Sequence, residues 1–181
     1  GFRTHGLTHP DRFVLELLST ALGGMMSSRL FLKVREEQAL AYYIHSEAQH
    51  YSTFGYFAVP AGVDNTRVNQ AISAIMEEIS AVKEKGLGEE ELQKAKDHLR
   101  GATALALESS SDWASFYGGQ EILLGQVLTP SEILRQIDKI TLEDIKRVSQ
   151  DIFQNAKLNL ALIGPAGKRD QTSFAKLLKV D

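Results

Sequence analysis

The hydrophobic period changes within one stretch, Ser27-Ser28-Arg29-Leu30-Phe31-Leu32-Lys33-Val34-Arg35-Glu36-Glu37-Gln38-Ala39-Leu40-Ala41-Tyr42-Tyr43. Its first part carries Leu30, Phe31 and Val34 at helical spacing, and Ser27 or Ser28 is placed to cap that short helix. Its last part begins an alternation of polar and apolar residues, which is typical of a strand. The stretch therefore predicts a helix that leads directly into a sheet.

The chain on either side extends this pattern. Alternation continues from Tyr42 to His50, and strand-forming residues return from Phe54 to Val59 after a turn at Ser52-Thr53, which predicts an antiparallel hairpin. Upstream, apolar residues at three- and four-residue spacing from Pro10 onward predict a helix that ends at Gly23-Gly24.

The C-terminal two thirds is mostly helical in its pattern. One helix is expected after a cap at Asp64 or Asn65 and ends at Lys85-Gly86; the next starts at Gly88. The buried stripe expected on that second helix is Leu92, Ala95, Leu99, Ala102 and Ala106. The remaining expected elements are a break at Ser109-Ser110-Ser111, helices over 112–124, from Pro130, from a Thr141-x-x-Asp144 capping box to Phe153 and after Thr172, and a closing strand over Lys157–Pro165.

Strands and helices that occur in separate runs predict an α+β fold, with an antiparallel-dominated sheet covered on one face by helices. We find no internal repeat, low-complexity tract or interior linker, so residues 1–181 are expected to form one domain. The N-terminus has no initiating Met and no apolar signal segment. It resembles a cut end, and we expect the chain to be a piece of a longer protein.

Composition excludes several classes of function. The formal net charge is −3 and the basic residues are scattered, which argues against a nucleic-acid partner. The chain has no Cys, so thiolate metal sites, disulfides and a cysteine nucleophile are excluded. No apolar run approaches the roughly 20 residues that span a bilayer. These features favour a soluble, cytoplasmic protein without fixing its compartment.

Motifs for metal, serine or phosphate chemistry are weak. His5 and His9 have the four-residue spacing of two zinc ligands, but Gly6 and Pro10 oppose a helix there and no accompanying Glu completes a zinc motif. Ser27 lacks the turn of a nucleophilic serine, and Gly23-Gly24 lacks a following Gly-Lys-Ser/Thr. The other histidines, His45, His50 and His98, are isolated in sequence, with His98 expected on the polar side of its helix. We therefore expect no metal site, and no independent small-molecule enzyme, within this chain.

Arg35 and Tyr42 are the candidate site residues. Arg35 ends the short helix and Tyr42 opens the strand that follows, so one loop joins a guanidinium to a phenol. These groups donate hydrogen bonds, and at one mouth of a sheet they could bind a peptide carbonyl or the oxyanion formed from it. From the spacing alone, the favoured interpretation is a surface ion pair for Arg35 and ordinary sheet packing for Tyr42.

A family resemblance favours a site role for Arg35 and Tyr42. The run Ser28-Arg29-Leu30-Phe31-x-x-Val34-Arg35-Glu36, followed by Leu40-Ala41-Tyr42, resembles the signature of the C-terminal-type domain of the peptidase M16 family, which includes pitrilysin, insulinase and mitochondrial processing peptidase. Further matches follow in the family's order. They are His9-Pro10-Asp11-Arg12, Leu22-Gly23-Gly24, Gly55, Glu90-Glu91-Leu92-x-x-Ala95-Lys96, Leu107-Glu108-Ser109, Ile140-Thr141-x-Glu143-Asp144-Ile145 and Leu162-Ile163-Gly164-Pro165.

The resemblance implies a division of roles between homologous halves. In this family a zinc-bearing half carries His-x-x-Glu-His, which this chain lacks, and an extended peptide substrate adds as a strand to a sheet edge in that half. The zinc-free half contributes an Arg and a Tyr, which correspond here to Arg35 and Tyr42, while Tyr43 should point to the opposite face. The implied reading is a non-catalytic domain of a zinc metallopeptidase, inactive alone, with zinc in a partner half on the same chain or another subunit. The alternative is a structural or partner-subunit domain with no peptidase role.

One position departs from the family pattern. The family usually has Gly before Leu-Ala-Tyr, whereas this chain has Ala39. If that position needs a positive φ, Ala would be strained there by about 1 kcal/mol.

Overall fold

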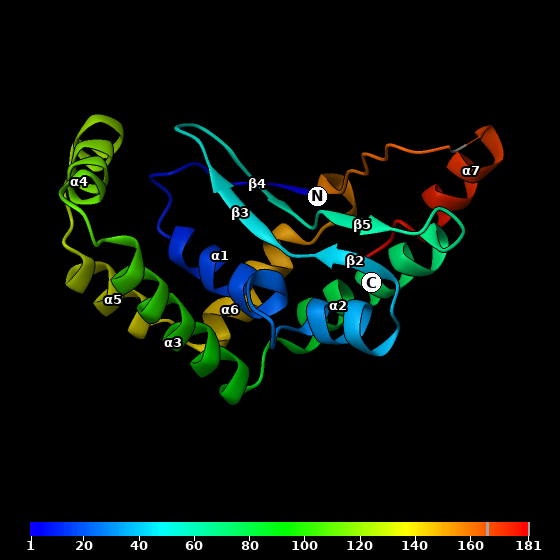
Figure 1. Ribbon diagram of the computed structural model, residues 1–181, viewed down its shortest axis with the longest axis horizontal. Coiled ribbons are helices and arrows are strands. Elements are labelled where there is room, and N and C mark those ends of the chain that lie inside the picture. Colours follow the sequence, from blue (N-terminus) through cyan, green and yellow to red (C-terminus); the bar gives the residue numbers. More distant parts are fainter. Residues whose placement is uncertain (166, 181) are drawn as a thin grey trace.

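The computed structural model describes residues 1–165 and 167–180 (Figure 1). It has the expected α+β architecture, in which short antiparallel strands lie against a larger helical layer. The elements in chain order are β1 (Phe2–Thr4), α1 (Arg12–Ser19), η1 (Thr20–Gly24), η2 (Phe31–Glu37), β2 (Ala41–Ile44), β3 (Glu47–His50), β4 (Gly55–Ala58), β5 (Ala61–Val63), α2 (Val68–Lys85), α3 (Glu89–Ala106), α4 (Ser110–Leu124), α5 (Pro130–Asp138), α6 (Leu142–Ile152), η3 (Asn155–Lys157) and α7 (Lys168–Leu177). No helix in the described ranges is long and apolar enough to cross a bilayer.

The predicted hairpin is confirmed, and it is longer than expected. β3 pairs antiparallel with β4, and β2, which precedes β3, pairs antiparallel with β5, which follows β4. The backbone N–H of His45 donates to the Pro60 carbonyl at 3.3 Å, which bridges the interruption between the two paired regions. β1 adds to the free edge of β4, so the order of the larger sheet is β1-β4-β3.

Helices α1, α6 and α2 cover one face of these strands. Phe2 and Phe57 point inward from β1 and β4, and their rings lie 5.0 and 5.2 Å from the ring of Phe153. Intervening residues such as Arg3 and Tyr56 are less buried, as strand alternation requires. The burial of these aromatic rings fixes which face of the sheet the helices cover.

The helix boundaries follow local capping chemistry. At the start of α6 the Asp144 N–H donates to Thr141 Oγ1 at 3.3 Å, and the Thr141 N–H donates to Asp144 Oδ2 at 3.1 Å, which confirms the predicted capping box. At the end of α2, Gly86 adopts a φ of 76°, as expected for a glycine after a helix.

Of two predicted caps, one lacks its side-chain hydrogen bond and the other is wrong. Ser28 stands directly before the helical residues that begin at Arg29, and its carbonyl accepts the Leu32 N–H at 3.0 Å, but its hydroxyl is buried without a hydrogen-bond partner and forms no side-chain cap. The Asp64 carboxylate accepts the Thr66 N–H at 2.7 Å in a local turn, and α2 begins only at Val68. The pattern thus placed the start of the first helix correctly and the start of α2 too early in the chain.

The closing strand predicted over Lys157–Pro165 is also wrong. Leu158 forms one isolated bridge to Phe2, and residues 159–165 form no strand. A strand needs a neighbour at pairing distance, and within the described part of the chain β5 pairs only with β2. The start of the closing segment pairs with the beginning of β1, where Gly1 and Asn159 exchange two backbone hydrogen bonds at 2.8 Å. A groove separates the rest of the segment from β5, so the pairing goes no further.

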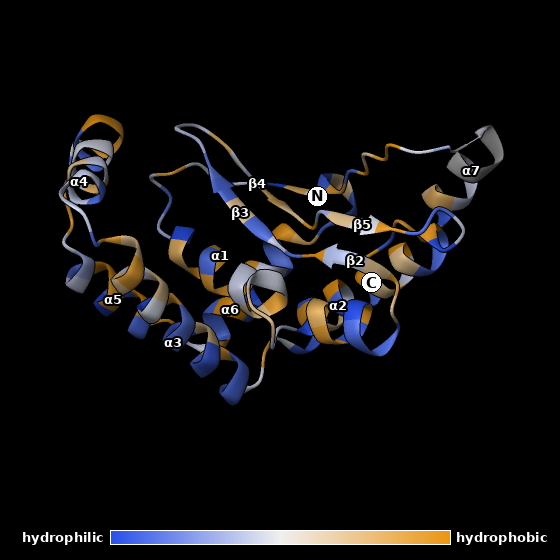
Figure 2. Ribbon diagram, in the orientation of Figure 1, coloured by the Kyte–Doolittle hydropathy of each residue, from blue (hydrophilic) through white to orange (hydrophobic). Residues whose placement is uncertain are grey.

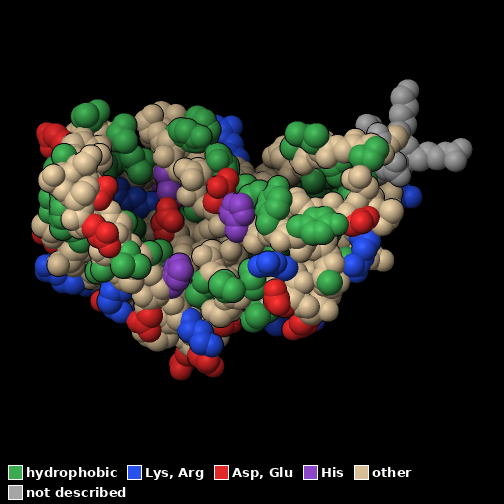
Figure 3. All heavy atoms as spheres, in the orientation of Figure 1, with side chains coloured by type: hydrophobic (Ala, Val, Ile, Leu, Met, Phe, Trp, Pro, Cys, Tyr) green, Lys and Arg blue, Asp and Glu red, His purple; other side chains and the backbone are tan. Residues whose placement is uncertain are grey.

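The stripe predicted on α3 is buried only in its first half. Leu92 and Ala95 are buried, whereas Ala102 and Ala106 are exposed. The following helix, α4, stands apart from the body of the domain at the left of Figure 1 and contains no buried residue. Its apolar residues include Ile122, which is 83% exposed. Part of the α4 ribbon is coloured as hydrophobic in Figure 2, and Figure 3 shows hydrophobic side chains at the surface on this side of the molecule. A helix this apolar without a covering layer is typical of an interaction surface.

An ion pair ties the signature stretch to the helical layer. Arg29 Nε and Nη2 donate to the two carboxylate oxygens of Glu91 at 2.5 and 2.7 Å, and Glu91 also accepts the Gly88 N–H at 2.8 Å. This forked contact joins the start of η2 to the N-terminus of α3. Arg29 in the signature therefore has a structural role.

Candidate functional site

Arg35 lies in the last turn of η2 with its side chain 41% exposed. Its guanidinium carbon sits 4.6 Å from the centre of the Phe31 ring, a cation–π contact that supports the side chain. Its Nε is 3.9 Å from Glu36 Oε1, too long for a hydrogen bond. The donors of Arg35 are therefore available to an incoming acceptor.

A tight turn connects Arg35 to β2. The Leu40 N–H donates to the Val34 carbonyl at 2.9 Å, which brings the start of β2 back beside the end of η2. Ala39 within this turn has a φ of 48°, so the position does require the left-handed conformation, and alanine is strained there by about 1 kcal/mol. The turn holds Arg35 and Tyr42 at its two ends.

Tyr42 is 74% exposed and Tyr43 is 57% exposed. The pairing of β2 with β5 shifts here, since Ala41 lies opposite Val63 and Tyr43 lies opposite Gly62, which leaves Tyr42 in a bulge. The Tyr43 ring packs over Gly62, where a Cβ atom would collide with it. Strict alternation, on which the opposite direction of Tyr43 was predicted, does not apply at a bulge. The Tyr42 ring is left in contact with solvent.

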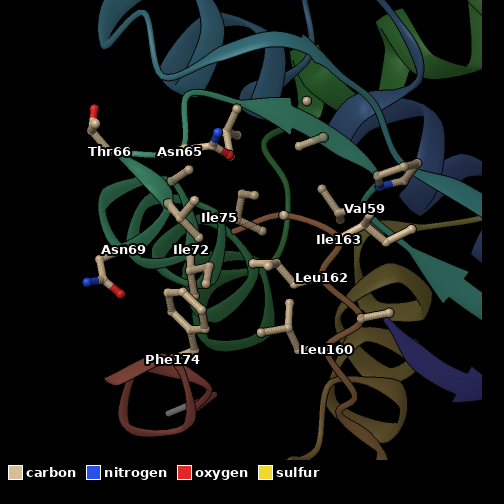
Figure 4. A pocket seen from close by; sticks show the side chains of 18 of the residues that line it. Val59, Asn65, Thr66, Asn69, Ile72, Ile75, Leu160, Leu162, Ile163 and Phe174 are labelled. Carbon is tan, nitrogen blue, oxygen red and sulfur yellow. The ribbon is translucent and has the colours of Figure 1, made fainter. Parts of the chain in front are cut away.

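A groove of about 700 Å³ borders this strand pair. Its walls are β5, the first turns of α2, the closing segment 160–165 and Phe174 of α7 (Figure 4). Its lining is mixed: Ile72, Ile75, Leu160 and Leu162 contribute apolar surface, and polar groups gather at the end formed by the turn before α2. Tyr43 belongs to its lining, so the groove runs up to the strand that carries Tyr42.

Comparison with known proteins identifies the fold and its family. The sequence model of the peptidase M16 inactive domain matches residues 1–99, more than half of the 181 residues. The chain belongs to the peptidase M16 family. The resemblance drawn from the run between Ser28 and Tyr42 is thereby confirmed.

Curated relatives agree with this assignment. A protein of Bacillus subtilis (strain 168) named as an uncharacterized zinc protease is 33% identical over 167 residues, covering 92% of this chain and 41% of that protein. One from Streptomyces coelicolor with the same description is 34% identical over 162 residues, covering 88% of this chain and 35% of that protein. The M16 chain described here thus spans about two fifths or less of the length of these relatives.

Solved structures show the same fold. A peptidase M16 inactive domain from Pseudomonas fluorescens superposes with a TM-score of 0.75 at 20% identity, covering 83% of this chain and 36% of that one. A protease from Helicobacter pylori gives a TM-score of 0.75 at 21% identity, covering 86% and 38%. A conserved protein from Enterococcus faecalis V583 gives 0.74 at 25% identity, covering 83% and 36%.

The histidines of this M16 domain do not gather into a zinc site. His5 stacks on His9 with ring centres 3.8 Å apart, and His5 Nε2 lies 2.9 Å from Asp151 Oδ2. His45 and His98 are exposed, and His98 lies on the polar side of α3 as predicted. Over residues 1–165 and 167–180, no group of three or more His, Asp or Glu side chains is arranged to hold a metal. The residues present do not fit the zinc ion that the names of the relatives imply.

Two features of the site were not predicted. Arg67 lies just before α2 and donates to the carbonyls of the turn that joins η2 to β2, a contact between residues distant in sequence that no local pattern indicates. The groove was missed because the closing segment was expected to be a paired strand. The isolated Gly62 opposite an aromatic run was a usable signal, since glycine within a strand often marks a bulge or a close approach.

The Glu16 carboxyl group, on α1, leads to a prediction of how the stability of the domain depends on pH. Its Oε1 lies 3.7 Å from His50 Nε2, and burial raises the pKa of Glu16 from its ordinary 4.5 to about 7. Between these values the folded state keeps a proton that the unfolded state releases, so this contribution to stability falls as pH rises from about 5 to 7 and is lost above it. We expect the melting temperature of the wild type, relative to Glu16→Gln, to fall across that window.

The wild type and Glu16→Gln are compared at each pH, because the nearby His50 also titrates. Burial lowers the pKa of His50, so its contribution to stability changes with pH in the opposite direction to that of Glu16. The Glu16 side chain is 42% exposed, so we expect a modest change in melting temperature and no loss of folding. Glu84→Gln, at an exposed position of α2, is the control and should run parallel to the wild type. Parallel curves for Glu16→Gln as well would contradict the assignment.

Proposed function

We propose that this chain is the zinc-free half of a zinc metallopeptidase, and that it supplies Arg35 and Tyr42 to a peptide-binding site completed by a homologous zinc-bearing half. The observation that carries the proposal is the pair of exposed hydrogen-bond donors at the two ends of one closed turn, within an M16 inactive domain. Zinc is assigned to the partner half, on the same polypeptide or a neighbouring subunit.

The chemistry of the two side chains fits this role. A guanidinium presents a rigid planar fork of N–H donors, and a phenol presents one O–H donor. Aimed at a peptide carbonyl, such donors bind the substrate, and they bind more strongly as negative charge develops on that oxygen. The Arg35 guanidinium already packs on the Phe31 ring, so its side chain loses less conformational freedom when it binds a substrate.

The exposed helical surface supports association with a second half. The C-terminal half of α3 and all of α4 present apolar side chains that nothing in the described part of the chain covers, including Leu105 at 72% and Leu123 at 60% exposure. Burying such a surface against a partner removes it from water, which stabilises the assembly. Domains that face each other across a shared chamber would need contacts of this kind.

Reconstitution tests the proposal. The chain alone should hydrolyse a fluorogenic peptide no faster than buffer and bind no stoichiometric zinc, whereas mixing it with its zinc-bearing half should restore cleavage. The parent protein or a neighbouring subunit should contain His-x-x-Glu-His. A structural domain without a peptidase role would leave the zinc-bearing half equally active with or without this chain.

A further inference from the structure

Arg67 is bonded to the turn between η2 and β2 through two successive carbonyl groups. Its Nη1 donates to the Ala39 carbonyl at 2.9 Å and its Nη2 donates to the Gln38 carbonyl at 3.0 Å. Its Nε also donates to Oε1 of the exposed Gln70 side chain, in the first turn of α2, at 3.1 Å. This two-carbonyl contact requires the fork geometry of arginine, which a lysine ammonium does not reproduce.

The carbonyls that Arg67 binds belong to a strained backbone. Ala39 has a φ of 48°, a conformation in which its Cβ crowds the carbonyl that follows. Strained residues of this kind persist only where their surroundings hold them. If Ala39 relaxed to a negative φ, the peptide groups on either side would reorient, and with them the Leu40 N–H that donates to the Val34 carbonyl.

We propose that Arg67 is a positioning residue, which holds the strained Gln38–Ala39 turn and thereby sets Arg35 and Tyr42 relative to each other. The inference rests on the proposed function, because the shape of the turn affects activity only if Arg35 and Tyr42 bind the same substrate. Each nitrogen of the Arg67 guanidinium already donates within the chain, so Arg67 acts on the site through the turn and does not itself contact substrate.

The test uses the assembled full-length peptidase with Arg67→Ala, Ala39→Gly and the double variant. Loss of the Arg67 hydrogen bonds to the turn should lower kcat by about 10-fold with little change in KM. A donor that is moved out of place loses more binding energy to the transition state than to the bound substrate. Glycine adopts a positive φ without steric cost, so adding Ala39→Gly should restore most of the lost rate. Gln70→Ala, which removes only the side contact, is the matched control and should retain the wild-type rate.

A second measurement reports directly whether the Gln38–Ala39 turn keeps its conformation. Hydrogen exchange at the Leu40 amide should be faster in Arg67→Ala and slower again in the double variant, since this amide is bonded only while the turn holds its shape. If Arg67→Ala does not accumulate as folded protein, Arg67→Lys takes its place, because it keeps the charge and loses the fork. A wild-type kcat without Arg67, or a loss that Ala39→Gly does not rescue, would overturn the inference.

Arg35→Ala and Tyr42→Phe are assayed in parallel to separate two kinds of failure. Normal turnover in both of these variants would remove the proposed function. Impaired turnover in both, together with a normal rate and normal Leu40 exchange in Arg67→Ala, would leave the proposed function intact and refute the positioning role alone.

Discussion

Arg35→Ala or Tyr42→Phe in the assembled peptidase should lower kcat/KM by about 10- to 10³-fold while its zinc content stays unchanged. The size of the effect follows from the role of the donors. A hydrogen bond that strengthens as the substrate carbonyl becomes an oxyanion contributes more to the transition state than to the bound substrate. Removing it therefore slows turnover more than it weakens binding, and the measurement is steady-state kinetics with metal analysis of the same samples.

The signature stretch offers controls for these variants. Tyr43→Phe removes a neighbouring phenol whose ring packs over Gly62, and Lys33→Ala removes a neighbouring cation that pairs with Glu37 at 3.1 Å. Both should keep the wild-type rate within about a factor of two, in line with the small contribution of exposed ion pairs. If the controls lose as much activity as Arg35→Ala and Tyr42→Phe, the loss reflects damage to the stretch as a whole.

Gly55→Ala should lower the free energy of unfolding by about 3 kcal/mol, at the upper end of the usual range for overpacking. Gly55 begins β4 between β1 and β3, and a Cβ atom there would come within 2.5 Å of the carbonyl oxygens of Gln49 and His5. Those oxygens belong to backbone on both sides of the strand, so relief of the contact requires strands to move apart. Denaturant unfolding of the two proteins measures the difference.

The opposite result is expected at a glycine in open space. Gly101 lies within α3, and a Cβ atom there would meet nothing within 4 Å. Gly101→Ala should therefore stabilise the protein by about 0.5–1 kcal/mol, because alanine is the better helix former. Equal effects at the two positions would mean that backbone entropy, and not the close approach around Gly55, determines the cost.

Several elements of the fold were predictable because their causes are local. A capping box at Thr141 and Asp144 needs only residues three apart, and a glycine after α2 ends that helix wherever it lies in the fold. The hairpin from Tyr42 to Val59 joins neighbouring segments, so its alternation and turn residues sufficed. The positive φ of Ala39 was predictable in the same way, from a family position that usually carries glycine.

The wrong predictions share a different cause. The alternation over Lys157–Pro165 is that of a strand, but a strand forms only where another offers a free edge at pairing distance. The spacing of Ala102 and Ala106 is that of a buried stripe, but burial requires a layer that covers it. In each case the sequence is compatible with the predicted feature, and the surrounding structure decides whether the segment pairs as a strand or the stripe is buried.

For this protein the sequence alone determined the α+β class, most helix ends, the M16 family and the identity of Arg35 and Tyr42 as candidates, because these depend on local spacing and on a motif. Only the tertiary structure decided that Tyr42 sits in an exposed bulge, that Arg67 reaches back to the turn at Ala39, and that a groove separates β5 from the closing segment. Such features depend on contacts between residues far apart in the chain, and periodicity carries no information about which distant partner a residue meets.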